Sequence, residues 1–195
     1  MAGEKFIVAA DNLLQITIRN ILCPNGYAYL AHCNDATTLI RFVRTMGPDF
    51  IVVDTELQQS DMRSALETID GEMLCASILL NDCKDAGILA MLEKSNAMCF
   101  CPKPVSNRDI LLQTVDMALM NYKRLSSLGR KLKEVTQDYE SRILIEHAKR
   151  ILMNKCGYSE NEAYQYMRKK SMDGRMKINT VAEAIINTYE IMRKG

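Results

Sequence analysis

Phe50-Ile51-Val52-Val53-Asp54 is the stretch from which the architecture of the first part of this chain can be predicted. Four apolar residues in a row, closed by a charged one, are typical of a strand that is buried on both faces. Similar apolar runs occupy residues 6–10, 27–31, 77–80 and 97–101. The pattern therefore predicts five buried strands within the first 119 residues.

Amphipathic stretches separate these runs and are typical of helices. One spans residues 39–46, with Asn34 or Asp35 placed to cap its N-terminus, and another spans residues 88–92. Strands that alternate with helices form parallel sheets with helices on both faces. We predict an α/β domain over residues 1–119, a flavodoxin-like, doubly wound, five-stranded parallel sheet.

Four polar residues lie at or shortly after the ends of predicted strands. Asp11 follows the first strand, Asp54 the third, Asn81 the fourth and Lys103 the fifth. Because the carboxyl ends of the strands meet at one edge of a doubly wound sheet, we expect these side chains to converge on one crevice. A carboxylate can attack a phosphoryl group only where Mg²⁺ and a lysine neutralise the charge between them, and this set contains both carboxylates and a lysine.

The set resembles the receiver domain of two-component response regulators, over roughly residues 4–120. The resemblance implies that Asp54 accepts a phosphoryl group, with a sensor histidine kinase as partner. It also implies that Asp11 and Asp54 hold Mg²⁺, that Lys103 contacts the phosphoryl oxygens and that Phe100 occupies the aromatic switch position.

Two departures from the receiver pattern leave two interpretations open. Ala10 stands where the family usually has a second acidic residue, and the loss of a carboxylate weakens Mg²⁺ binding. Asn81 stands where the family usually has Ser or Thr, and its amide can still donate a hydrogen bond with a longer reach. Asp82 either adds a ligand or repels the phosphoryl group. Asp54 is thus either a working phosphoacceptor with a weak Mg²⁺ site, or part of a pseudo-receiver kept for docking and dimerisation.

The net charge of +1 hides an asymmetry between the two parts of the chain. Residues 1–119 hold 9 Lys and Arg against 15 Asp and Glu, a balance of −6, whereas the residues from Met120 onward hold 16 against 9, a balance of +7. This asymmetry suggests that the C-terminal part meets a polyanion. The alternative is that its basic residues form ordinary solvated helix faces.

A short heptad pattern follows the predicted sheet. Its apolar residues recur at spacings of 3, 4, 3 and 4 and are Leu125, Leu128, Leu132, Val135 and Tyr139. Such a pattern predicts a coiled-coil linker helix over residues 120–138 and a homodimer formed through residues 120–145. The alternative is a single amphipathic helix that packs on its own domain.

Helix boundaries can also be predicted in the last segment. Gly157 is placed as a helix C-cap, and Ser159 with Glu162 forms a possible capping box for the next helix. Thr180 with Glu183 forms a second possible capping box. Together they predict three helices.

The same segment contains a series of short motifs in a fixed order. They are Ala148-Lys149-Arg150-Ile151-Leu152-Met153, Gly157-Tyr158-Ser159, Ala163-Tyr164, Met167-Arg168-Lys169-Lys170-Ser171 and Val181-Ala182. The order resembles the ANTAR domain, a three-helix RNA-binding module of bacterial transcription antiterminators. The resemblance implies an all-α domain over residues 139–195 that binds paired hairpins in nascent leader RNA. Arg150 departs from the family, which often has glycine there.

The cations of this segment carry the expectation of RNA contact, because Lys and Arg neutralise phosphates. They are Lys149, Arg150 and Lys155 near the end of the first helix, and Arg168, Lys169, Lys170, Arg175 and Lys177 around the second connection. Small residues such as Ala148, Ala163 and Ala182 are expected in the core. Tyr164 and Tyr166 either stack on unpaired bases or belong to that core.

We therefore interpret the chain as a cytoplasmic bacterial regulator of transcription antitermination, with a degenerate receiver as input. A DNA-binding response regulator and an adaptor without nucleic-acid binding are the alternatives. Catalysis is not expected, because the sequence suggests no Ser-His-Asp or Cys-His set and contains no glycine-rich phosphate loop. Seven cysteines without a CxxC pair indicate reduced thiols, and no apolar run has the length of a membrane span.

Overall fold

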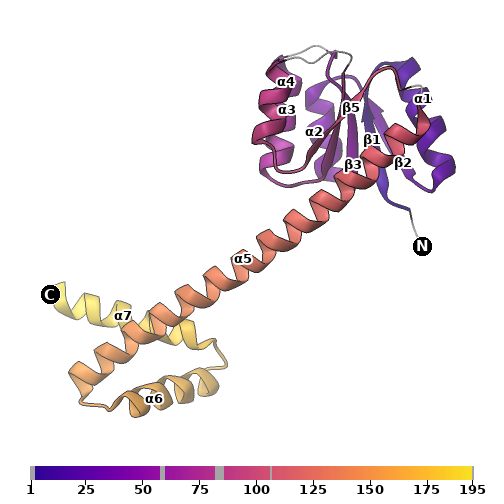
Figure 1. The fold of residues 1–195 in the computed structure, drawn as a ribbon. Helices are drawn as coiled ribbons and strands as arrows, with labels where there is room; N and C mark the ends of the chain where they lie inside the picture. Colours follow the sequence, from indigo (N-terminus) through magenta and orange to yellow (C-terminus); the bar gives the residue numbers. More distant parts are fainter. Residues whose placement is uncertain (1–2, 58–59, 82–85, 106, 195) are drawn as a thin grey trace. The chain divides into compact units, whose positions relative to one another are not determined.

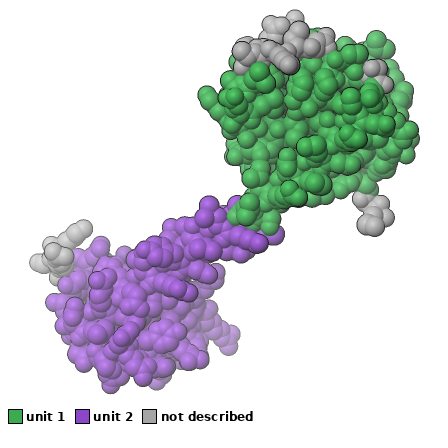
Figure 2. Space-filling view, in the orientation of Figure 1, with its two compact units in different colours: residues 1–128 green, residues 129–195 purple. Residues whose placement is uncertain are grey.

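The computed structural model describes residues 3–57, 60–81, 86–105 and 107–194. The chain divides into two compact units, residues 1–128 (unit 1) and 129–195 (unit 2) (Figure 2). One helix, α5 (Arg108–Cys156), contributes residues to both units. Within the described ranges, no helix has the combination of length and apolarity that a bilayer crossing requires.

Unit 1 is built on a parallel sheet with the strand order β2-β1-β3-β4-β5 (Figure 1). In the part of the chain that the structure describes, the strands are β1 (Lys5–Ala9), β2 (Ala28–Cys33), β3 (Phe50–Asp54), β4 (Ala76–Asn81) and β5 (Met98–Pro102). Every residue of β3, the central strand, is buried. The predicted doubly wound, five-stranded sheet is thus confirmed, with strand ends within two residues of those expected.

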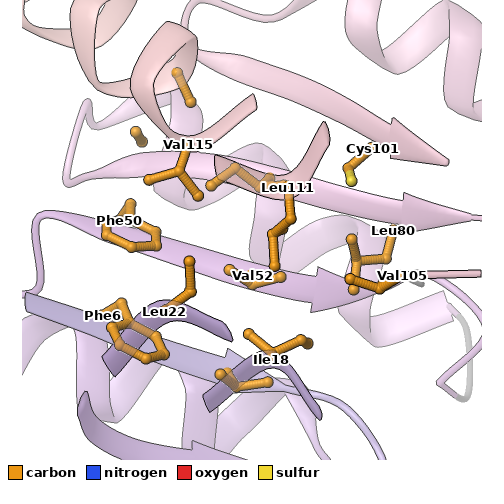
Figure 3. Packing of buried hydrophobic residues seen from close by; sticks show 14 of the residues in the cluster. Phe6, Ile18, Leu22, Phe50, Val52, Leu80, Cys101, Val105, Leu111 and Val115 are labelled. Atoms are coloured by element: carbon orange, nitrogen blue, oxygen red, sulfur yellow. The ribbon is translucent and has the colours of Figure 1, made fainter. Parts of the chain in front are cut away.

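Helices cover both faces of this sheet (Figure 1). They are α1 (Asn12–Leu22) and α5 on one face, and α2 (Ala36–Met46), α3 (Ser60–Gly71) and α4 (Ala86–Lys94) on the other, with a short 3-10 helix, η1 (Cys23–Asn25), after α1. On the α1 and α5 face, the rings of Phe6 and Phe50 stack with centroids 5.4 Å apart (Figure 3). Ile18 of α1 and Leu111 of α5 belong to the same cluster (Figure 3).

Two aspartates begin the first two helices of unit 1. The Asp11 carboxylate accepts a hydrogen bond of 2.8 Å from the amide of Leu14, and the Asp35 carboxylate accepts one of 2.8 Å from the amide of Thr38. The second contact resolves the choice between Asn34 and Asp35 as the cap of α2. Hydrogen bonds from Thr38 hold the pKa of Asp35 below its ordinary value. Both caps satisfy backbone donors that a helix leaves unpaired at its N-terminus.

The heptad residues of α5 lie between the two hydrophobic cores and are exposed. Their exposed fractions rise from 37% at Leu125 to 61% at Leu128 and 69% at Leu132, with 66% at Val135 and 65% at Tyr139. These side chains are thus not buried on the domain that precedes them. This exposure does not favour the alternative in which the helix packs on its own domain.

Unit 2 contains the last part of α5, α6 (Glu160–Asp173) and α7 (Ile178–Lys194). Its core holds the small and apolar residues that the sequence placed there, namely Ala148, Leu152, Ala163, Met167, Val181, Ala182 and Ile186. Small residues allow helices to approach closely, which explains the three alanines that are fully buried. The predicted three-helix, all-α arrangement is confirmed.

One of the two predicted capping boxes in unit 2 exists. Gly157 has the positive φ of 69° expected of a C-cap, and Ser159 with Glu162 forms a reciprocal capping box at the start of α6. The second box is wrong, because α7 begins at Ile178 and the amide of Thr180 already bonds to the carbonyl of Lys177 at 3.0 Å.

Lys149 differs from the expectation that it lies on an RNA-contacting surface. Its side chain is only 8% exposed, and its ammonium lies 2.7 Å from Glu146 and 2.6 Å from Glu160. The pairing raises the pKa of Lys149 and holds the pKa of Glu160 below its ordinary value. Two carboxylates already neutralise this cation, so it joins α5 to the start of α6 and does not face a phosphate.

We expect this pairing to make the stability of unit 2 depend on pH. Because the pKa of Glu160 is lowered in the folded state, the stabilisation is present above its ordinary value of 4.5 and lost as the pH falls through the folded pKa. The protection factors of the α6 amides, which are hydrogen-exchange rates corrected for the intrinsic pH dependence of exchange and measured by mass spectrometry, should therefore fall as the pH drops below about 4.5.

In Lys149→Met this loss of protection should be smaller, because two unpaired glutamates repel each other until they are protonated. Lys131→Met is the matched control, since Lys131 is an exposed lysine of the same helix. An unchanged pH dependence in Lys149→Met would contradict the assignment.

Candidate functional site

The carboxyl ends of β3 and β5 bring Asp54 and Lys103 together. The Asp54 side chain is 7% exposed, and its Oδ1 lies 2.7 Å from Nζ of Lys103. The same Oδ1 accepts a hydrogen bond of 3.0 Å from the amide of Glu56. The convergence predicted from the strand ends is thus observed for these two residues.

Lys103 is also paired with a carboxylate that the sequence analysis did not single out. Its Nζ lies 3.1 Å from Oε2 of Glu56. Burial by itself lowers the pKa of Lys103, but the hydrogen bonds and charges of Asp54 and Glu56 outweigh it and leave the pKa raised. Lys103 therefore stays protonated and holds two carboxylates together at the sheet edge.

Glu56 comes two residues after Asp54, in the turn that follows β3. The alternation of an extended chain does not reach into this turn, so the strand ends point to Asp54 and not to Glu56. The third charge at this edge of the sheet is therefore visible only in the structure.

Asn81 lies at the end of β4 and is buried, 7% exposed. Its side-chain amide donates a hydrogen bond of 2.8 Å to Oγ1 of Thr55, whose hydroxyl donates one of 3.0 Å to the carbonyl of Leu80. This chain of bonds links β3 to β4 beside Asp54. Asp82, the neighbouring acid considered above, lies outside the described residues.

Asp11, the other carboxylate predicted at the strand ends, caps a helix. It is exposed and caps α1, and Ala10 beside it is fully buried and carries no ligand atom in its side chain. Among the described residues, no group of three or more His, Cys, Asp or Glu side chains is placed to hold a metal ion. The side chains of Asp11 and Asp54 alone thus supply fewer oxygen ligands than the octahedral coordination of Mg²⁺ requires.

Phe100, at the aromatic switch position, lies in β5 and is 38% exposed. Its ring is therefore not enclosed in the core of the sheet. An exposed ring of this size on an edge strand is available for contact with another surface.

In unit 2, all the predicted RNA-contacting cations except Lys149 are exposed. They are Arg150 and Lys155 on α5, Arg168, Lys169 and Lys170 on α6, and Arg175 and Lys177 in the connection between α6 and α7. Tyr164 and Tyr166 are 41% and 37% exposed, so neither is a core residue. Seven of the predicted RNA-contacting cations and the rings of Tyr164 and Tyr166 are thus exposed on unit 2.

Sequence comparisons identify the C-terminal unit. The family described as "ANTAR domain" matches residues 133–186. The chain is similar to the transcriptional regulatory protein PdtaR of Mycobacterium tuberculosis, with 22% identity over 95% of this chain and 90% of that protein. It is also similar to the aliphatic amidase regulator of Pseudomonas aeruginosa, with 33% identity over 35% of this chain and 37% of the relative.

Solved structures identify the fold of the N-terminal unit. The signal receiver domain of a modulated diguanylate cyclase from Desulfovibrio desulfuricans has a TM-score of 0.55 and 21% identity, covering 62% of this chain and 97% of that one. A CheY-like receiver domain protein from Methanospirillum hungatei has a TM-score of 0.55 and 17% identity, covering 64% and 98%. Residues 133–186 therefore match the ANTAR domain, and the N-terminal unit has the fold of receiver domains.

Proposed function

We propose that this protein binds hairpins of nascent leader RNA through its ANTAR domain, disfavours the terminator hairpin and so lets transcription continue in the cytoplasm. The observation that carries the proposal is the ANTAR match over residues 133–186, which coincides with a three-helix bundle whose surface is cationic. PdtaR and the aliphatic amidase regulator are named as regulators, which supports a regulatory role here.

Exposed cations supply the affinity in this proposal. Arg168, Lys169 and Lys170 are consecutive and exposed at the end of α6, and Arg175 and Lys177 follow in the adjoining connection. Such a group of positive charges neutralises phosphates and releases counterions, which makes binding depend strongly on salt. Sequence-specific recognition of RNA then uses unpaired loop bases, since the deep groove of an RNA helix is closed to side chains.

Replacing Arg168, Lys169 and Lys170 together by Gln should weaken binding to a two-hairpin RNA. Because each phosphate contact contributes about 0.7 to the slope of log K against log salt concentration for single strands, the slope should fall by about 2. The measurement is fluorescence anisotropy of the full-length protein with this RNA and with a DNA duplex of equal length, across a salt series.

The matched control replaces Arg130, Lys131 and Lys133, which are exposed on α5, by Gln. It removes the same charge and should change the slope less. Equal or tighter binding to the DNA duplex would favour a DNA-binding response regulator, and no binding to either nucleic acid would favour a protein-interaction adaptor.

We further propose that the protein is a homodimer formed through residues 120–145 of α5. The heptad face is exposed from Leu128 to Tyr139, and Leu132 has 69% of its surface in water. A second copy of the same helix would bury these residues in a coiled coil. Two joined RNA-binding units would then engage two hairpins with a high effective concentration.

Leu128→Asp combined with Leu132→Asp should convert the dimer to a monomer, because charges on this face would lose their hydration in the coiled coil. Sedimentation equilibrium should give twice the chain mass of 22.1 kDa for the wild type and a single chain mass for the variant. Lys133→Asp, on the same exposed helix, is the control. A wild type that sediments as a monomer at all concentrations would refute the dimer.

The receiver-fold unit, in our proposal, serves mainly as a docking and dimerisation platform that binds Mg²⁺ weakly. This fits the single capping carboxylate at Asp11 and the buried Ala10 beside it. Phosphorylation of Asp54 by a sensor histidine kinase is the second candidate. It is favoured by the 2.7 Å contact with Lys103, which provides a cation for the phosphoryl oxygens.

Ala10→Asp should strengthen Mg²⁺ binding about tenfold or more, because it restores a carboxylate beside Asp11. Without Mg²⁺ the variant should be less stable than the wild type, since it buries an added charge. Thermal melts in a Mg²⁺ titration, against NaCl at equal ionic strength, should show a larger rise in Tm for the variant. Ala10→Asn is the uncharged control, and an equal rise in all three proteins would contradict the weak site.

A further inference from the structure

Unit 2 contains an open groove of about 900 Å³ that the proposed function has not used. The last turns of α5 and α6 and one side of α7 form its walls. Its volume lies within the range of about 300 to 1,000 Å³ found for ligand sites. Much of the lining is aliphatic, with Ile151, Val181 and Ile185 among the residues that contribute.

Two tyrosines and two lysines give this groove its chemistry. The ammonium of Lys155 lies 5.4 Å from the ring centre of Tyr189, and that of Lys170 lies 5.8 Å from the ring centre of Tyr166. All four residues line the groove. Each aromatic ring is thus accompanied by a positive charge, an arrangement suited to a flat ring attached to an anionic chain.

Asp173 and Thr188 add polar atoms to the same lining. A carboxylate accepts hydrogen bonds and donates none when ionised. Adenine, guanine and cytosine carry an amino group with two hydrogens that can donate to it, whereas uracil offers only its single ring N3–H. The lining therefore combines aliphatic side chains, two lysines and one carboxylate.

We infer that this groove takes up an unpaired base of the RNA loop, which stacks on Tyr166 or Tyr189 while Lys155 and Lys170 contact the flanking phosphates. The inference rests on the proposed function and adds to it the site at which a base is read. Charge complementarity selects this occupant over an apolar helix of a second copy, because such a helix would strip water from both lysines without neutralising them.

Asp173 then sets the preference among bases. The carboxylate favours a base that carries an amino group, so a uridine at the recognised position should bind more weakly. Asp173→Asn should reduce the difference in affinity between RNA with uridine and RNA with another base at this position, because an amide both donates and accepts hydrogen bonds.

The test uses the full-length protein and a two-hairpin RNA whose loops are selected for binding from a randomised pool. Each loop nucleotide is replaced in turn by an abasic one. For the wild type, we expect at least one position to lower affinity by roughly 5- to 150-fold, the range expected for stacking of one base on an aromatic side chain.

Ala184→Phe fills the groove without a change of charge, from an exposed position on α7. This variant should bind the intact RNA as weakly as it binds the abasic RNA. Its slope of log K against log salt concentration should equal that of the wild type. Asn187→Phe places the same side chain on the same helix outside the groove and should behave as the wild type. Tyr166→Leu combined with Tyr189→Leu, checked for folding by circular dichroism, is the second groove variant, and abasic replacement should no longer lower its affinity for the RNA.

Cys156 provides an independent readout, because it lines the groove and is exposed. Burial raises the pKa of Cys33 to about 11 and that of Cys75 to about 12, so these thiols react slowly. Intact RNA should protect Cys156 from iodoacetamide, mapped by mass spectrometry, and abasic RNA should protect it less.

The outcomes separate this inference from the proposed function. If the wild type binds the selected RNA, but abasic replacement lowers the affinity of Ala184→Phe and of the double tyrosine variant as much as that of the wild type, the base site is refuted and RNA binding stands. If Ala184→Phe instead abolishes dimerisation without RNA, the groove belongs to a second copy. If the pool yields no RNA that binds, both the function and the base site fail.

Discussion

One continuous helix takes part in both hydrophobic cores of this protein. Leu111 and Val115 of α5 pack in the core of unit 1, and Ala148 and Leu152 of the same helix pack in the core of unit 2. Between these contacts, its heptad face is exposed. Most helical stability in proteins comes from packing of an apolar face, so the middle of α5 lacks the support that its two ends have. A second copy of the helix would supply it, which is why the dimer belongs to the same proposal as RNA binding.

Two lysines show how tertiary contacts assign different tasks to the same residue type. Lys103 and Lys149 are both largely buried, and each is paired with two carboxylates. Lys103 joins the carboxyl ends of two strands at the candidate phosphoacceptor, whereas Lys149 joins two helices of the bundle. A buried cation that lacks a partner is costly, so each lysine requires its carboxylates. The cations that remain on the surface of unit 2 are the ones available to a polyanion.

The fold was predictable because it follows from local patterns. Buried parallel strands need continuous apolar runs, and the run at residues 50–53 is the centre of the observed sheet. Ser159 and Glu162 form the capping box that their spacing predicted. The box expected at Thr180 failed because a helix begins where packing and backbone bonds first become favourable, here at Ile178, and a capping pair three residues apart recurs by chance.

The sequence by itself determined the strand ends, the three-helix segment and the resemblance to ANTAR domains, since these depend on the order and spacing of residues along the chain. Only the tertiary structure decided that Glu56 joins Asp54 and Lys103, that Lys149 is withdrawn from the surface, and that Tyr166 and Tyr189 line one groove. Such contacts join residues from different elements. Side-chain burial and the angle at which helices pack set their distances, and neither quantity is encoded in local spacing.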